Sequence, residues 1–353
     1  MNGIVVSRDA ESSERSASIP RSRAPLRGLR VAVNRLNIAG SKDKVYHVQE
    51  RIGKGNYHML FSVLASGSSG NASLIEIGGF GVLIDAGLGP RQLGKRLADA
   101  GASWHHIHAV VLTHIHGDHW NERTLTHLYR RGIPLFCHAG HHDMLAEESQ
   151  AFHDLRSAGL VRNYAEEREL RLSRTLHCIP IPVRHDGGVT CGFRFEGEAD
   201  FFGQRWSLGY ATDLGSWEDN LAEALANIDV LALEFNHDVD MEMSSGRTPE
   251  LIARVLGDAG HLSNLQAAEL VRRIVGCSKP GRLRHLVQLH LSRECNRPAL
   301  ARAAAREALA DDVKIHSAHQ DRSGPCLALG RSQRRPMKQR RQNRQQACFP
   351  GWE

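Results

Sequence analysis

A short segment rich in histidine and aspartate, residues 108–120 (HAVVLTHIHGDHW), constrains the fold of this chain more than any other feature. Its first half is an apolar run that predicts a β-strand, and its second half is a polar loop. Residues that follow a strand end have a rigid base, so they are well placed for chemistry. The segment therefore predicts a sheet protein with a functional loop at a strand end.

The spacing within this loop favours metal binding. His114 and His116 are two residues apart, so in extended geometry they point to one side. Gly117 permits a sharp turn, after which Asp118 and His119 can face a second point nearby. One ion takes three or four protein ligands, so four ligands in two directions predict two ions in a shared site. The alternative is a polar turn with solvated histidines, but such a turn would not require this spacing.

Short apolar runs bounded by glycine and aspartate predict strands at 60–65, 73–77, 80–85, 108–112, 133–137, 176–183, 189–195, 205–211, 229–235 and 284–290. Helices are predicted at 90–100, 120–131, 139–150, 217–226, 248–257, 263–275 and 297–310. The early strands follow one another directly, whereas the later ones alternate with helices. This order indicates a mixed sheet system with helices packed outside.

The basic charge of the chain is concentrated at its two ends. Residues 1–58 hold 11 Lys and Arg against 5 Asp and Glu, and residues 331–353 hold 7 against 1. Residues 59–330 hold 27 against 33, although the whole chain is formally +6. We expect a disordered N-terminal extension and a low-complexity C-terminal tail around one central domain. An alternative is that Met59 is the natural start and that the upstream residues are over-read coding sequence.

The composition also limits the location of the chain. No run of about 18 apolar residues predicts a membrane span, and the N-terminus lacks the apolar region of a secretory signal. Seven cysteines are scattered without a CxxC pair, which argues against a disulfide framework. We therefore expect a cytoplasmic protein without a membrane partner, and the oligomeric state stays open.

The HxHxDH loop and residues downstream of it resemble the metallo-β-lactamase-fold hydrolases. This resemblance implies the α/β class, as an αββα four-layer sandwich with residues 59–330 as the catalytic domain. It implies two divalent metal ions, zinc or manganese, with iron also compatible with such ligands. The implied ligands are His114, His116 and His185 for one ion, Asp118, His119 and His290 for the other, and Asp213 bridging both. Asp85 matches an early strand-end aspartate of the family and is expected to orient a ligand histidine or the loop.

Four segments resemble the YycJ (WalJ) branch of this family, whose members are described as DNA exonucleases. These segments are SVLASGSSGNAS, LEFNHD, GHLSN and LHLSRECNRP, and the resemblance covers roughly residues 60–316. One departure is Cys295, where the branch tends to carry Asn, while Asn296 and Pro298 are kept. The branch implies a metal-dependent phosphodiesterase that acts on nucleic acid, DNA in preference to RNA, as a 5′-to-3′ exonuclease.

The expected mechanism uses both ions. Two cations about 3.5–4 Å apart hold a bridging hydroxide at neutral pH and clamp the oxygens of a phosphodiester. We expect this hydroxide to attack phosphorus in line, with Asp118 orienting the nucleophile and taking its proton. His261, in GHLSN, is expected to contact a phosphate or to act as a general acid.

Polar residues at turns and strand ends are expected to contact the substrate. Ser263 and Asn264 stand at the start of a predicted helix whose free N–H groups can bind phosphate, although a simple helix cap explains them equally well. The SGSSGN turn is expected to be an anion-binding nest or a tight hairpin. The expected contacts are Ser68, Ser69, Asn71, Asn236, His237, Ser263, Asn264 and Ser292.

Other functions stay open because one fold supports many reactions. A thioester, lactone or β-lactam hydrolase would use the same metal ligands, but Asp118 and Ser292 favour phosphodiester cleavage. The interval between Asp213 and His290 is too short for the inserted domain of a β-CASP ribonuclease. A binding module that has lost its metals is disfavoured by the complete ligand set.

Overall fold

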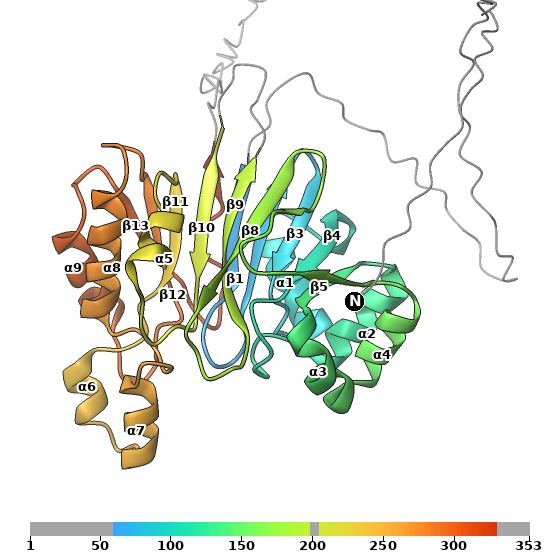
Figure 1. Cartoon of the computed structure of the whole chain (residues 1–353), viewed down its shortest axis with the longest axis horizontal. Helices are drawn as coiled ribbons and strands as arrows, with labels where there is room; N and C mark the ends of the chain where they lie inside the picture. Colours follow the sequence, from blue (N-terminus) through green and yellow to red (C-terminus); the bar gives the residue numbers. More distant parts are fainter. Residues whose placement is uncertain (1–58, 198–204, 330–353) are drawn as a thin grey trace, which may run out of the picture. The chain divides into compact units, whose positions relative to one another are not determined.

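The computed structural model describes residues 59–197 and 205–329, all of which belong to one compact unit, Gly53–Glu353. The extension predicted at 1–58 and the tail predicted at 331–353 lie outside the described residues. Within the described part, the chain forms two seven-stranded sheets that pack face to face, with helices on both outer sides (Figure 1). No helix among residues 59–197 and 205–329 is long and apolar enough to cross a membrane.

The first sheet has the strand order β14-β1-β2-β3-β4-β5-β6. Its strands from β14 to β3 pair antiparallel, and those from β3 to β6 pair parallel. The strands are β1 (Met59–Ala65), β2 (Ala72–Ile77), β3 (Phe80–Ile84), β4 (Ile107–Val111), β5 (Leu135–His138), β6 (Val161–Tyr164) and β14 (Leu327–Leu329).

The second sheet has the order β13-β12-β11-β10-β9-β8-β7. Strands β10 to β13 pair parallel, whereas β7 to β10 pair antiparallel, so β8, β10, β11 and β12 run in one direction. The strands are β7 (Leu170–Arg171), β8 (Leu176–Val183), β9 (Thr190–Gly197), β10 (Ser207–Ala211), β11 (Val230–Glu234), β12 (His285–Leu289) and β13 (Lys314–Ser317).

Helices cover the outer face of each sheet (Figure 1). The first sheet packs against α1 (Pro90–Asp99), α2 (Glu122–Arg131), α3 (His142–Glu148) and α4 (Gln150–Ser157). The second packs against α5 (Asp219–Ala224), α8 (Asn264–Gly276) and α9 (Pro298–Glu307), while α6 (Val239–Met243) and α7 (Pro249–Leu256) follow β11. Short 3₁₀ turns lie at Trp104–His106 and Ala139–His141.

Three apolar layers hold these elements together. A central layer between the sheets contains Phe61, Phe193 and Tyr210, all nearly free of solvent contact. Two outer layers join each sheet to its helices, with Leu125 and Leu270 as examples. Burying one large apolar side chain contributes about 1.5–3 kcal/mol, so the central layer fixes how the sheets face each other. The expected αββα four-layer sandwich is confirmed.

The parallel strands determine where polar side chains meet. Parallel neighbours end at the same edge of a sheet, so the residues after β3 and β4 lie together, as do those after β10, β11 and β12. These strand ends carry Asp85, the HxHxDH loop, Asp213, Glu234 and His290. Residues separated by more than 200 positions in the chain therefore reach one site.

Candidate metal centre

Three histidines form the first ligand group. His114 and His116 follow β4, and His185 follows β8. Their rings meet edge to face, with centroids 4.8, 5.1 and 4.9 Å apart. Nδ1 of His185 lies 3.0 Å from the carbonyl oxygen of Gly260, to which it donates, so its Nε2 is free and lies 3.2 Å from Nδ1 of His116. One nitrogen from each ring lies within 4.8 Å of the others.

Asp118, His119 and His290 form the second group, and their ligand atoms also lie within 4.8 Å of one another. Oδ2 of Asp118 is 3.6 Å from Nε2 of His119 and 3.6 Å from Nε2 of His290. His290 follows β12, so this group joins a loop of the first sheet to a strand end of the second. Its formation depends on the packing of the two sheets.

Asp213, which follows β10, lies between the two groups. Its Oδ2 is 3.2 Å from Nε2 of His119, and its Oδ1 is 3.5 Å from Nε2 of His290. Oδ1 also lies 4.0 Å from Nε2 of His185 in the first group. One carboxylate thus faces ligands of both groups, which is the position that a shared ligand requires.

The residues at this centre fit a pair of divalent ions. Nε2 of His114 and Nε2 of His290 are buried and have no hydrogen-bond partner among the described residues. A buried polar atom without a partner calls for an explanation, and a metal ion supplies one. Imidazole and carboxylate donors in threes and fours suit zinc and other first-row divalent metals.

Two buried carboxylates orient the ligand histidines. Oδ2 of Asp85 accepts a hydrogen bond from Nδ1 of His119 at 2.9 Å, and Thr113 donates to the same carboxylate through its backbone N–H and its hydroxyl. Oε1 of Glu234 lies 3.1 Å from Nδ1 of His290. Each contact fixes the proton on Nδ1 and leaves Nε2 as the ligand atom, as in many metal sites.

No sequence motif pointed to Glu234 as a residue of the centre. It ends β11 and is fully buried, and its Oε2 accepts the backbone N–H of Leu214 beside Asp213. In the sequence, an acidic residue at the end of the otherwise apolar strand VLALE could have indicated this role. A carboxylate that is buried in such a strand requires charged or hydrogen-bonding partners.

The backbone is strained at three residues of the centre. Asp85, Asp213 and His290 have φ values of 62°, 57° and 53°, which lie in the left-handed region. Residues other than glycine rarely adopt this conformation, and it often occurs at functional sites. Each of these residues follows a strand end, so the left-handed turn directs its side chain into the centre instead of along the strand.

The charges within the centre stabilise one another. Burial lowers the pKa of His119, but Asp85 and Asp213 outweigh it and raise that pKa to about 10. Burial raises the pKa of Asp213, but His290 and His119 hold it well below its usual value. Burial and the neighbouring His119 lower the pKa of His114, which favours its neutral, ligating form. The charges of the centre therefore favour protonated His119 and His290 beside an ionised Asp213.

His261 lies at the border of the centre and is only 16% exposed. Its ring centroid is 5.2 Å from that of His185 and 5.1 Å from that of His290. Nδ1 of His261 donates to Oε1 of Glu234 at 2.8 Å. Burial lowers the pKa of His261, but Glu234 outweighs this effect and the net pKa is raised.

The SGSSGN turn joins β1 to the centre. Ser68 and Ser69 are exposed at its tip, and the Ser69 hydroxyl donates to Oε1 of Gln320 at 3.1 Å. Asn71 is buried, and its side-chain amide donates to Oδ2 of Asp118 at 3.0 Å. The turn therefore places Asn71 against a candidate ligand and leaves the two serines facing solvent.

Four other expected substrate contacts are engaged inside the fold. The Asn236 amide donates to the carbonyl oxygen of His290 at 2.9 Å, and His237 is fully buried. Ser263 caps helix α8, because its hydroxyl accepts the backbone N–H of Gln266 at 3.2 Å. Asn264 donates to Asn296 at 3.0 Å. The hydrogen bonds of Asn236, Ser263 and Asn264 favour a supporting role, which for Ser263 is the helix cap. Both ring nitrogens of His237 are buried without a hydrogen-bond partner among the described residues.

Asp186 and Arg254 also approach the first group, although no sequence motif pointed to either. Oδ1 of Asp186 lies 3.6 Å from Nε2 of His116 and 3.5 Å from Nε2 of His185. Arg254 of α7 holds this carboxylate with both Nε and Nη2, the latter at 3.1 Å from Oδ1. The only sequence signal was the acidic residue directly after His185, because α7 is brought close by the fold alone.

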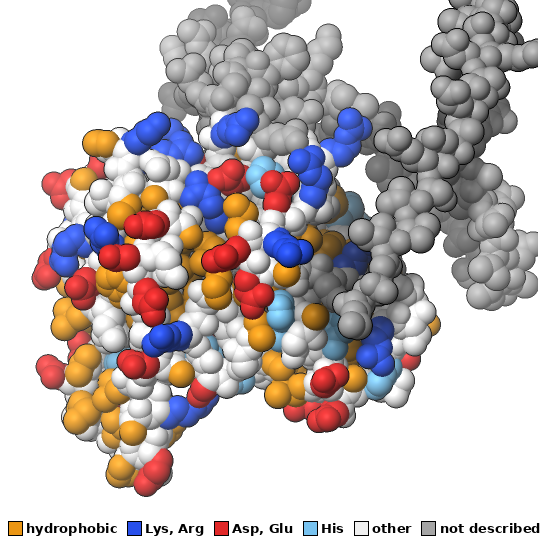
Figure 2. All heavy atoms as spheres, in the orientation of Figure 1, with side chains coloured by type: hydrophobic (Ala, Val, Ile, Leu, Met, Phe, Trp, Pro, Cys, Tyr) orange, Lys and Arg blue, Asp and Glu red, His pale blue; other side chains and the backbone are white. Residues whose placement is uncertain are grey.

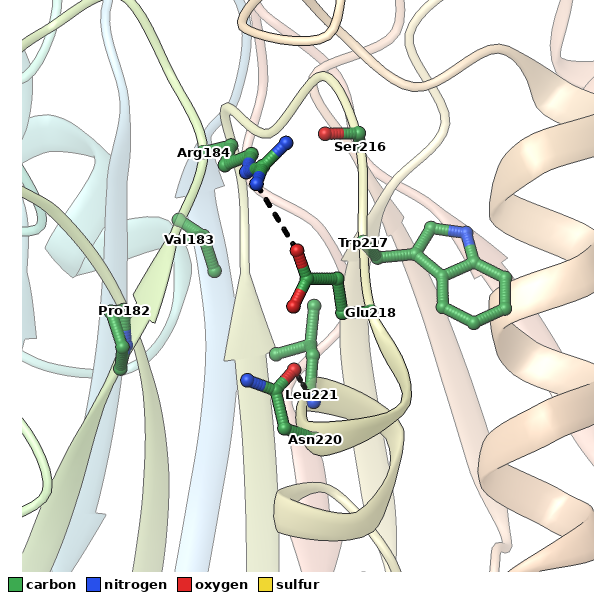
Figure 3. A pocket seen from close by; sticks show the side chains of 8 residues that line it. All are labelled: Pro182, Val183, Arg184, Ser216, Trp217, Glu218, Asn220 and Leu221. Carbon is green, nitrogen blue, oxygen red and sulfur yellow. Dashed lines mark hydrogen bonds and ion pairs between the residues drawn. The ribbon is translucent and has the colours of Figure 1, made fainter.

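A separate pocket lies beside the ends of β8 and β10 (Figure 3). It has a volume of about 210 Å³, and Arg184 and Glu218 point toward each other across it, 3.1 Å apart. The ring of Trp217 turns away from this ion pair. None of the clustered ligands lines the pocket. Arg184 lines this pocket, whereas the next residue, His185, belongs to the first ligand group.

Comparisons with known proteins agree with this geometry. The Beta-lactamase superfamily domain model matches residues 81–280. The chain is 29% identical over 282 residues to Exodeoxyribonuclease WalJ of Streptococcus pneumoniae serotype 2 (strain D39 / NCTC 7466), covering 76% of this chain and 97% of that protein. It is 26% identical over 257 residues to Exodeoxyribonuclease YycJ of Bacillus anthracis, covering 70% and 88%.

The fold agrees as well. The crystal structure of the metallo-beta-lactamase fold protein YhfI from Bacillus subtilis superposes with a TM-score of 0.55 at 16% identity, covering 78% of this chain and 100% of that one. The family model spans more than half of the chain, and the sandwich and its clustered strand-end ligands match that assignment. The chain therefore belongs to the beta-lactamase superfamily, as one of its metallo-hydrolases.

Proposed function

We propose that this protein is a 5′-to-3′ DNA exonuclease that requires two divalent metal ions. The observation that carries the proposal is the union of two ligand groups around Asp213 with an adjoining Glu234–His261 pair. The two exodeoxyribonuclease relatives support DNA as the substrate, because the alignments with them extend over most of this chain.

His114, His116 and His185 would hold one ion, Asp118, His119 and His290 the other, and Asp213 would serve both. We propose zinc or manganese, with iron as a further possibility given the ligand types. Such ions lower the pKa of a bound water and neutralise the charge that builds up on a phosphodiester during cleavage.

In the proposed reaction, Asp118 takes a proton from the attacking water. Its side chain is 22% exposed, in contrast to the fully buried His119, so one edge of the carboxylate faces the open side of the centre. Burial raises the pKa of Asp118, but the nearby His290 and His119 bring it below its usual value. The group is therefore ionised at neutral pH, and Asn71 holds its orientation.

In the proposed reaction, His261 donates a proton to the leaving oxygen. The Glu234 carboxylate on Nδ1 raises the pKa of His261 and so favours the protonated imidazole, and it leaves Nε2 as the atom that can donate. General acid catalysis of this kind contributes about 10²–10⁴-fold to the rate. Nδ1 of His261 lies 3.7 Å from Oδ1 of Asp213, so the proposed acid adjoins the carboxylate that both ligand groups face.

The test uses oligonucleotides labelled at one end. Purified protein with added Mn²⁺ or Zn²⁺ should shorten 3′-labelled DNA stepwise, and it should release labelled mononucleotide at once from 5′-labelled DNA. RNA and a thioester serve as alternative substrates, and His114→Ala serves as the inactive control. Thioester turnover without DNA cleavage would show that the protein is a small-molecule hydrolase on the same fold.

A further inference from the structure

A second cavity lies next to the metal centre, at the residues that follow β12 and β13. Its volume is about 410 Å³. Polar and basic side chains dominate its lining, namely Ser292, Arg293, Arg297, His319, Gln320 and Arg322. The cavity is distinct from the pocket beside β8 and β10, because the two share no lining residue.

Two short links connect this cavity to the metal centre. His290 is a candidate ligand, and the next two residues along the chain, Leu291 and Ser292, line the cavity. Gln320 forms the second link, because its amide donates to the carbonyl oxygen of Leu291 at 3.2 Å and its Oε1 accepts from Ser69 at 3.1 Å. The SGSSGN turn therefore contacts a lining residue of the cavity through Ser69 and a candidate metal ligand through Asn71.

The cavity is basic within a domain that is formally acidic. Three arginines and a single acid, Asp321, line it, whereas residues 59–330 as a whole hold 27 basic against 33 acidic side chains. On the face shown in Figure 2, Lys and Arg are interspersed with Asp and Glu. The lining of this cavity therefore differs in charge from the domain as a whole.

Existing contacts preorganise these arginines. Arg293 pairs with Asp321 at 2.6 Å, and Arg322 donates to Nε2 of His319 at 2.8 Å. Nη1 of Arg297 donates to the carbonyl oxygens of Arg293, Glu294 and Asn296 at 3.3, 3.2 and 2.6 Å. Arg293 and Asp321 are 52% and 80% exposed, so an incoming anion can compete for the arginine.

Helix α9 adds a weaker contribution from the same side. It begins at Pro298, which lines the cavity, and the residue before it, Arg297, gives no side-chain cap. The first N–H groups of an uncapped helix and the helix dipole both favour an anion. This feature supplements the arginines.

We propose that this cavity binds a phosphate group of the nucleic-acid strand while the strand is cleaved at the metal centre. The proposal rests on the function proposed above. The guanidinium groups match the geometry and charge of phosphate oxygens. The phosphate belongs either to the strand terminus or to an internal phosphodiester, and both present the same oxygens to arginine.

The test compares the full-length protein with an Arg293→Gln/Arg322→Gln variant. Binding of fluorescently labelled single-stranded DNA is measured by anisotropy in EDTA, over a series of salt concentrations. We expect Kd to rise on the order of tenfold at low salt, and the slope of log Kd against log salt to fall by about 0.7 for each lost phosphate contact. An unchanged Kd and slope would overturn the proposal.

Two controls separate binding from folding. Arg130→Gln removes an exposed arginine from the far end of α2 and should leave Kd unchanged. Turnover of bis(4-nitrophenyl) phosphate, which reaches only the metal centre, should stay within about twofold of wild type. Equal loss of this turnover and of DNA binding would show that the arginines support the fold, which also contradicts the proposal.

Further measurements identify the source of the phosphate. They also separate the proposed phosphate site from the proposed exonuclease activity. A variant effect confined to 5′-phosphorylated DNA indicates a terminal phosphate, whereas an equal effect on 5′-hydroxyl DNA indicates an internal one. Because binding is measured in EDTA, it does not depend on catalysis. Wild-type protein that binds DNA through these arginines but does not cleave it would contradict only the proposed exonuclease.

Discussion

Oε1 of Glu234 lies 2.8 Å from Nδ1 of His261. The same atom lies 3.1 Å from Nδ1 of His290, so one buried carboxylate orients both a candidate ligand and the proposed general acid. Under the proposed function, metal ligation and proton transfer would therefore be coupled through a buried residue.

This coupling predicts the effect of Glu234→Gln. The affinity for the second metal ion should fall about 10–100-fold, as is usual when a partner of a ligand histidine is lost. The pKa of His261 should also fall, because Glu234 is the main group that raises it. Competition with a chelator measures the affinity, and the pH–rate profile reports His261. Glu223→Gln on the exposed side of α5 is the matched control.

Asp85→Asn tests the other orienting carboxylate. Asp85 is fully buried and accepts from His119 at 2.9 Å, so an amide there no longer fixes the proton on Nδ1. We expect metal affinity to fall about 10–100-fold while the fold is retained. The metal content after dialysis and the circular dichroism spectrum check both statements. Asp99→Asn at the exposed end of α1 should change neither.

Metal binding should release protons. His119 has a pKa of about 10 in the metal-free centre, and the pKa of His290 is also raised well above the usual value, so both rings are protonated at neutral pH. A ligand nitrogen must be deprotonated, so the affinity should increase with pH. Calorimetric titrations in buffers of different ionisation enthalpy give the proton count. A count of zero would contradict the protonated network.

The raised pKa of His119 also predicts how the stability of the metal-free protein depends on pH. The pKa of His119 is raised from 6.5 to about 10 on folding, so its contribution to stability is fully present below pH 6.5 and is lost as the pH rises through about 10. Denaturant unfolding in EDTA across this range should show stability decreasing at alkaline pH. His119→Gln should flatten that decrease.

Gly87→Ala should disturb the metal centre by displacing the backbone of Asp118. A Cβ atom at Gly87 would overlap the carbonyl oxygen of Asp118, which accepts the backbone N–H of Asn71 at 2.7 Å. We expect about 1–3 kcal/mol of destabilisation and a weaker second metal site. Thermal unfolding and metal content provide the measurements. Gly89→Ala, where a Cβ meets nothing within 4 Å, should behave as wild type.

The fold was predictable where local patterns decide it. Each predicted strand and helix overlaps an element of the structure, because apolar periodicity reflects burial directly. The prediction missed α4, α6 and the short strands β6, β7, β13 and β14. Ser149 explains one case, since the helix predicted at 139–150 ends there and the Ser149 hydroxyl caps a second helix, α4.

The candidate site was predictable in part for a related reason. The HxHxDH spacing is local, but Glu234 is hidden within an apolar strand, and only the order β10-β11-β12 places it between Asp213 and His290. Asn264 and His237 stand at element ends, where sequence gives no direction for the side chain. In the structure, Asn264 hydrogen-bonds to Asn296 and His237 is completely buried, so both side chains point into the fold.

Reversible metal dependence of DNA cleavage is the most direct measurement of the central claim. The wild-type protein should lose cleavage of labelled DNA after EDTA treatment and dialysis, and it should regain cleavage when Mn²⁺ or Zn²⁺ is restored. His114→Ala should stay inactive at every metal concentration. DNA cleavage that persists in EDTA, or that survives in His114→Ala, would contradict a metal centre built from these residues.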